Sequence, residues 1–156
     1  MIQLKKGRDG PSTLACVRAD GTRTWGKLHP FFPPHDLTHC AVESVLGFHD
    51  AFFGLVAAGW DLDDFAQPGA AARLPAQALW AENIVGILDR ERLLPEPLSP
   101  QAFNEDLAAA LSGQNVPVCS PLAPSDLTHI RDLRDDLLVR WSSVSAGGTL
   151  EISFPS

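Results

Sequence analysis

Residues 33–59, P-P-H-D-L-T-H-C-A-V-E-S-V-L-G-F-H-D-A-F-F-G-L-V-A-A-G, contain the longest apolar region of the chain, residues 41–58, and the expected fold is organised around this segment. The two prolines suit the first turn of a helix, where a missing N–H removes no hydrogen bond, and Gly59 suits its end. Apolar side chains would cover most of the circumference, which is typical of a helix buried inside a domain. The sequence therefore predicts one central helix over about residues 34–58, weakened locally by Gly47 and Gly54.

The segments at the two ends of the chain have the pattern of strands. Residues 1–28 contain β-prone runs on both sides of Asp20-Gly21, a pair that predicts a two-residue hairpin turn. Such a turn would place Arg18 opposite Arg23. Residues 150–154, L-E-I-S-F, alternate between apolar and polar, so we expect a final strand in the same sheet as the hairpin.

Three more helices are expected, each with a proline or a serine at its start. They cover about residues 74–93 with Pro75 in the first turn, 100–111 with Ser99 as cap, and 126–143 with Ser125 as cap. The expected fold is α+β, with a single domain over residues 1–156. In it a small antiparallel sheet, the N-terminal hairpin plus the C-terminal strand, packs with about four helices, one of them central and buried.

The composition excludes several classes of function. The net charge is −7, with 12 Lys and Arg against 19 Asp and Glu and no basic block, so we expect neither nucleic acid nor a membrane surface as partner. The N-terminus lacks a signal peptide pattern, and the apolar region carries charged residues that argue against a membrane span. Cys16, Cys40 and Cys119 lie far apart, which predicts reduced thiols and a cytoplasmic protein. The sequence does not predict the oligomeric state.

A stripe of ionisable side chains lies on the expected central helix. His35, His39 and Glu43 are four residues apart, which places them on one helix face, and Asp36 borders them. A buried ionisable group is costly unless it is paired or binds a metal. The sequence therefore predicts a divalent-metal site at His35, His39 and Glu43, with zinc as the first choice and nickel, iron or manganese as alternatives.

The ligand set of this site stays open at the level of sequence. Glu43 lies roughly 12 Å along the helix axis from His35, so the ion could lie between the histidines or between His39 and Glu43, or Glu43 could orient His39. The remaining ligand should come from another helix. The candidates are Glu82 or Asn83 first, and then His49, His29 and His129.

The segment P-P-H-D-L-T-H-C-A-V-E, continued by G-F-H-D-A-F-F-G, resembles a bacterial family of small uncharacterised proteins that shares H-D-L-T-H-x-x-V-E followed by F-F-G. The resemblance covers about the first 65 residues and implies no activity. The H-D-x-x-H part also resembles the metal motif of a ubiquinone-biosynthesis protein family, where a glutamate follows twelve positions after the second histidine. Ala51 stands at that position here, so the likeness fails at the third ligand.

Two functions are compatible with these features. The first is a metal-dependent enzyme, a hydrolase or a lyase, that acts on a small-molecule substrate, with Asp36 or Glu43 as base or as an orienting group. The alternative is a non-catalytic binding or structural protein in which the same side chains form a buried His/carboxylate hydrogen-bond network. An open coordination position beside a pocket would favour the enzyme. Four aromatic residues, Phe31, Phe32, Trp25 and Trp60, could wall such a pocket, but core packing is their expected role.

Overall fold

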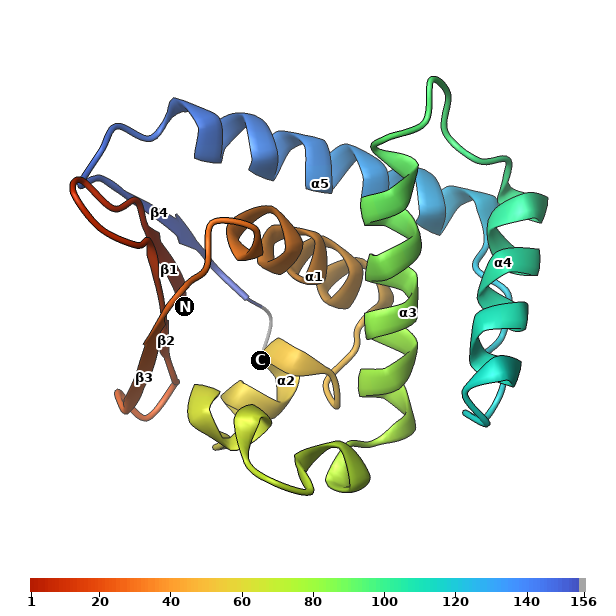
Figure 1. Ribbon diagram of the computed structural model, residues 1–156, viewed down its shortest axis with the longest axis horizontal. Helices are drawn as coiled ribbons and strands as arrows, with labels where there is room; N and C mark the ends of the chain where they lie inside the picture. The colour runs from red at the N-terminus through yellow and green to blue at the C-terminus, as the bar shows by residue number, and fades with distance from the viewer. Residues whose placement is uncertain (155–156) are drawn as a thin grey trace.

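The computed structural model describes residues 1–154, which fold into a four-stranded sheet, five α-helices and two 3-10 helices. In chain order the elements are β1 (Ile2–Lys5), β2 (Thr13–Val17), β3 (Arg23–Lys27), α1 (Phe32–Leu46), α2 (Phe52–Ala57), η1 (Leu62–Ala66), η2 (Ala70–Arg73), α3 (Ala76–Glu91), α4 (Pro100–Gly113), α5 (Pro124–Ser143) and β4 (Thr149–Ile152). In Figure 1 the sheet lies at the left and α1 in the centre, with α5 above it, α3 at its right and α2 below. This is the expected α+β fold.

The sheet joins the two ends of the chain. Its strand order is β3-β2-β1-β4, and all neighbours are antiparallel. Ile2 of β1 lies opposite Cys16 on one side and Ile152 on the other. Leu4, the next inward-facing residue of β1, is completely buried. The prediction that the hairpin and the final strand belong to one sheet is therefore confirmed.

The hairpin turn between β2 and β3 is one residue longer than the sequence predicts. The Arg18 N–H donates to the Thr22 carbonyl at 2.9 Å, and the Gly21 N–H donates to the Arg18 carbonyl at 3.0 Å. Gly21 alone has a left-handed backbone, with φ of 84°, as in hairpins with three-residue loops. The register places Val17 opposite Arg23, so the expected pairing of Arg18 with Arg23 is wrong.

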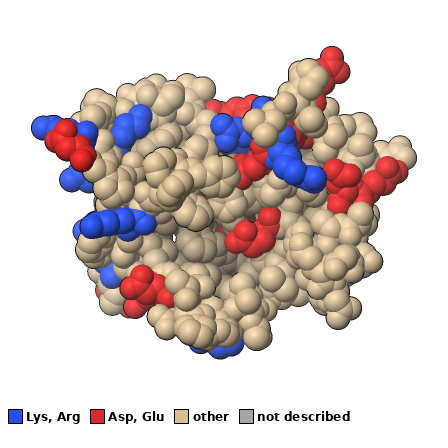
Figure 2. Space-filling view, viewed as in Figure 1, with Lys and Arg blue, Asp and Glu red and all other residues tan. Residues whose placement is uncertain are grey.

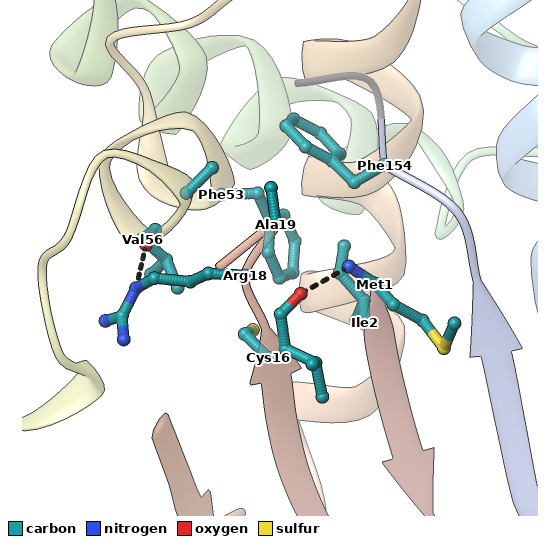
Figure 3. A pocket seen from close by; sticks show the side chains of 10 residues that line it. Met1, Ile2, Cys16, Arg18, Ala19, Phe53, Val56 and Phe154 are labelled. Atoms are coloured by element: carbon teal, nitrogen blue, oxygen red, sulfur yellow. Dashed lines mark hydrogen bonds between the residues drawn. The ribbon is translucent and has the colours of Figure 1, made fainter. Parts of the chain in front are cut away.

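Arg18 instead ties the hairpin to the end of α2. Its Nε donates to the Val56 carbonyl at 2.7 Å, and its Nη2 donates to the Trp60 carbonyl at 2.6 Å. Figure 3 shows the bond to Val56 beside a cavity that Cys16 and Phe53 help to line. That cavity measures only about 50 Å³, so it is a packing gap and not a ligand site.

The continuous helix expected over residues 34–58 is wrong, because two helices occupy this segment. Gly47 has a left-handed backbone with φ of 63°, and its N–H donates to the Glu43 carbonyl, which ends α1. The chain then bends and starts α2 at Phe52. A Cβ at Gly54 would lie 2.2 Å from the His49 carbonyl oxygen, so only glycine permits this tight bend.

Helix α1 is nevertheless the central helix of the fold. Residues 36–43 are all buried, and the helix packs against α5, α3 and α2 (Figure 1). Leu37 of α1 belongs to the same hydrophobic cluster as Leu4 of β1 and Leu137 of α5. Within residues 1–154, no helix combines the length and the apolar composition needed to cross a bilayer.

The helix starts follow the sequence in one case and depart from it in two. Ser99 caps α4, because its Oγ accepts from the Ala102 N–H at 3.2 Å, as predicted. Helix α5 starts earlier, with Pro124 in its first turn and Ala123 at the cap position, so the expected cap at Ser125 is wrong. Pro75 is the cap residue of α3 and not part of its first turn.

Candidate metal centre

Two histidines of α1 face one glutamate of α3. His35 and His39 lie one helical turn apart, with ring centroids separated by 4.9 Å. The Nε2 atom of His39 is 3.4 Å from one Glu82 carboxylate oxygen, and the Nε2 atom of His35 is 3.9 Å from the other. One ligand atom from each of the three residues lies within 4.8 Å of the other two, so the group could hold a metal ion.

The second ring nitrogen of each histidine contacts a different carboxylate. The Nδ1 of His35 is 2.8 Å from Asp89, and the Nδ1 of His39 is 3.1 Å from Glu43. When the imidazoles are neutral, Nδ1–H donates to these carboxylates and the Nε2 lone pairs point toward Glu82. Metal-binding histidines are usually held in this way.

Glu43 occupies a place different from the predicted ligand position. One of its oxygens contacts His39, and the other accepts hydrogen bonds from the N–H groups of Phe53 at 2.9 Å and Gly54 at 3.2 Å. The side chain is only 1% exposed and lies outside the group of three. Its geometry matches the other role that the sequence left open, in which Glu43 orients His39.

The structure distinguishes among the candidates for the remaining ligand. Glu82 joins the two histidines, whereas the neighbouring Asn83 donates its amide to the Leu79 carbonyl and bonds the side chain of Gln114. The other three candidates, His29, His49 and His129, are exposed and lie outside the group. Of the candidates for the remaining ligand, only Glu82 belongs to the group of three.

The sequence did not predict the part that two acidic residues, Asp89 and Asp36, take in the site. Asp89, which holds His35, was missed, although it follows Glu82 by seven residues and therefore lies two turns further along the same face of α3. Asp36 was expected only to border the stripe. It is 6% exposed, and its Oδ2 has no hydrogen-bond partner among residues 1–154. Burial raises the pKa of Asp36 to about 7, although His39 and His35 act in the opposite direction.

The carboxylates around His39 strongly favour its protonated form. Burial alone lowers the pKa of His39, but hydrogen bonds with Glu43 and Glu82 outweigh burial and raise this pKa to about 10. Burial raises the pKa of Glu82, yet its contact with His39 lowers that pKa overall. A cation bound at this group would take the place of the His39 proton.

A cavity of about 400 Å³ opens beside the group. His35, Asp36, His39 and Glu82 line one end of it. Figure 2 shows the surface hollowed between the sheet and the helices, with acidic side chains beside the hollow. Phe52 also lines this cavity and is half-buried, whereas the central helix predicted over residues 34–58 would bury this side chain in the core.

The aromatic side chains near the cavity are exposed. Phe31 is 62% exposed, Phe32 is 45% exposed, and their ring centroids lie 6.1 and 6.2 Å from that of His35. Trp25 is 59% exposed on β3. The core role expected for these three residues is therefore wrong, and the two phenylalanines form an apolar lip beside His35.

Comparison with known proteins gives no match to any protein-family model, curated protein or solved structure. The interpretation of the site therefore rests on its own geometry. Two imidazoles and one carboxylate, converging beside a cavity, could hold a divalent ion.

Proposed function

We propose that the protein binds a divalent transition-metal ion, zinc in the first place, through His35, His39 and Glu82. One observation carries the proposal: both Nε2 atoms face the same carboxylate while both Nδ1 atoms contact carboxylates of their own. Two histidines and a glutamate form a known ligand set of catalytic zinc, and the held Nδ1 atoms are the usual support for it.

The same centre supports a hydrolase or a lyase that acts on a small molecule. Three protein ligands leave a coordination position free, and the cavity lies next to them. A bound zinc ion supplies Lewis acidity and lowers the pKa of a coordinated water. Asp89 and Glu43 hold the imidazoles, and Glu43 has no oxygen left for the cavity. Asp36 lines the cavity and is the residue placed to exchange a proton there.

One observation favours the non-catalytic alternative. Both ring nitrogens of His39 face carboxylates, at 3.1 Å from Glu43 and 3.4 Å from Glu82, as a protonated imidazole would require. In that case the cluster is a buried ion-pair network, and the protein stays metal-free.

Metal titration distinguishes the two functions. Protein purified without an affinity tag is stripped with a chelator and titrated calorimetrically with zinc, nickel, ferrous iron and manganese at about pH 7.5, where a bound metal must displace the His39 proton. We expect one equivalent of metal to bind, and none in the double variant His35→Ala, His39→Ala. The matched control Asn83→Ala, next to Glu82 but bonded elsewhere, should bind as the wild type does. Wild-type protein that binds none of the four ions would leave the ion-pair network as the function of this cluster.

The open coordination position is tested on cobalt-substituted protein. Acetohydroxamic acid should change the visible spectrum, because a catalytic site accepts an outside ligand. A cobalt spectrum that does not respond would indicate a closed structural site and contradict the hydrolase or lyase.

A further inference from the structure

We infer that the cavity beside His35, His39 and Glu82 binds an uncharged small molecule with a polar head that hydrogen-bonds Asp36 and an apolar body at least as large as one aromatic ring. The inference deepens the proposed function by naming its substrate class. It rests on the proposed function only for the reaction at the metal ion. Binding of the ligand itself needs only Asp36 and the cavity walls, which are present without a metal.

Asp36 indicates the polar head. The other buried carboxylates have partners for both oxygens: Glu43 contacts His39 and two backbone N–H groups, and Glu91 accepts from Arg131 and from the Leu98 N–H. Asp36 Oδ2 is equally buried and has no partner among residues 1–154. Because buried polar groups are nearly always hydrogen-bonded, a partner from outside the chain is expected. A primary amide or a hydroxyl on a ligand provides the required group.

The cavity walls indicate the apolar body. Beyond the polar end they consist mainly of Leu14, Leu28, Phe52 and Leu62. Gly26 of β3 contributes no side chain, and a Cβ there would make only an ordinary contact of 3.6 Å with Leu62. The space is therefore kept open by the absence of a side chain at one position. Phe32, 45% exposed, continues the apolar surface to the lip of the cavity.

The charges around the cavity indicate an uncharged ligand. Asp36, Asp63 and Glu82 line it together with a single lysine, Lys27. Without a metal the three carboxylates still outnumber the two cations of the cavity, Lys27 and the protonated His39, so an anion finds no unpaired positive charge there. With a divalent ion, the ion and Lys27 together balance the three carboxylates. A charged ligand would then lose its hydration without gaining an unpaired counter-charge.

Fluorine NMR with two matched probes tests the ligand class. Para-fluorobenzamide and para-fluorobenzoate share a ring and differ in the charge of the head. In the metal-free full chain we expect the amide to bind at least about tenfold more tightly than the carboxylate. Equal binding, or tighter binding of the carboxylate, would overturn the inference.

Variants then locate the probe. Gly26→Val fills the cavity and should weaken amide binding about tenfold or more, whereas Thr13→Val, on the outer face of the sheet, should not. If Gly26→Val does not fold, Leu62→Phe narrows the same cavity from η1. Asp36→Leu should abolish the advantage of para-fluorobenzamide over fluorobenzene, which lacks the polar head, and leave fluorobenzene binding unchanged. If these substitutions leave the affinity for para-fluorobenzamide unchanged, the probe does not bind in this cavity and the inference is wrong.

The two hypotheses fail separately. Protein that binds zinc but does not distinguish the probes overturns this inference and leaves the proposed metal centre. Protein that binds the amide in the cavity but takes up no zinc contradicts the metal centre and leaves the ligand class.

Discussion

Glu43 connects the candidate metal centre to the fold through a single carboxylate. One oxygen holds the Nδ1 of His39, and the other accepts the first N–H groups of α2 from Phe53 and Gly54. The residue that orients a candidate ligand therefore also fixes the start of the next helix. A change at Glu43 should affect stability and metal binding together.

We predict that Glu43→Ala destabilises the protein by about 3–5 kcal/mol, because it leaves buried donors without an acceptor. Glu43→Gln should lower zinc affinity by about 10–100-fold through loss of the held imidazole. Urea unfolding and calorimetry measure the two effects. Gln77→Ala is the control: Gln77 caps a backbone N–H at Asp50 on the surface, and its removal should cost only about 1 kcal/mol. Wild-type stability of Glu43→Ala would contradict the role assigned to Glu43.

The second prediction at this scale concerns the pH dependence of the metal-free protein. The pKa of His39 is raised to about 10 in the fold, above its ordinary value of 6.5. The stability that His39 contributes is therefore fully present below about pH 6.5 and is lost as the pH rises through about 10. The groups that face it are Glu43, Glu82, Asp36 and His35.

Unfolding of wild type and His39→Gln, compared between about pH 6 and pH 10, measures this contribution. The difference in unfolding free energy should shrink as the pH rises, and a difference that grows would contradict the assignment. For the same reason zinc affinity should keep rising well above pH 6.5, the limit that the ordinary histidine value alone would suggest, because zinc displaces the His39 proton.

At the scale of elements, the break between α1 and α2 shapes the site. A continuous helix would carry Phe52 and Phe53 away from Glu43, whereas the bend at Gly47 returns the N-terminus of α2 to the Glu43 carboxylate. It also brings the Phe52 ring to 5.8 Å from the ring of His39, where it forms a wall of the cavity. The cavity therefore depends on where α1 ends.

Two glycine substitutions, which should change the stability of the protein in opposite directions, test whether α1 ends at Gly47. Gly47→Ala should destabilise by about 1–2 kcal/mol, because φ of 63° is strained for a residue with a Cβ. Gly86→Ala, inside α3 with open space around a new Cβ, should stabilise by about 0.5–1 kcal/mol. Thermal unfolding measures both. Stabilisation by Gly47→Ala would show that the helix does not end there in solution.

At the scale of the whole molecule, β1 and β4 hold the chain ends together. Leu150 of β4 lies opposite Leu4 of β1 and is 6% exposed, whereas the neighbouring Glu151 faces solvent. The fold is therefore completed only when the last strand pairs with the first.

We predict that Leu150→Ala destabilises the protein by about 2–5 kcal/mol, as for other leucines removed from cores. Glu151→Ala, on the same strand but on the outer face, should change stability by no more than about 0.5 kcal/mol. Chemical unfolding of the two variants provides the comparison. Equal effects would indicate that β4 is not packed on the core.

Local patterns in the sequence determined the element types, the shared sheet and the face of α1 that carries His35 and His39. Alternation, capping residues and four-residue spacing act over a few neighbouring residues and can be recognised without a structure. The register of the hairpin and the split of the central helix were not predicted. Each depends on one glycine, Gly21 or Gly47, that adopts a left-handed backbone conformation, and the local sequence does not show which glycine will do so. Tertiary structure alone decided that Glu82 completes the group, that Asp89 and Glu43 hold the imidazoles, and that Asp36 is left without a partner beside a cavity. Apart from the contact between Glu43 and His39, which lies within α1, these contacts join residues on different helices. Their distances follow from the packing of α1 against α3 and α2, which local sequence patterns do not encode.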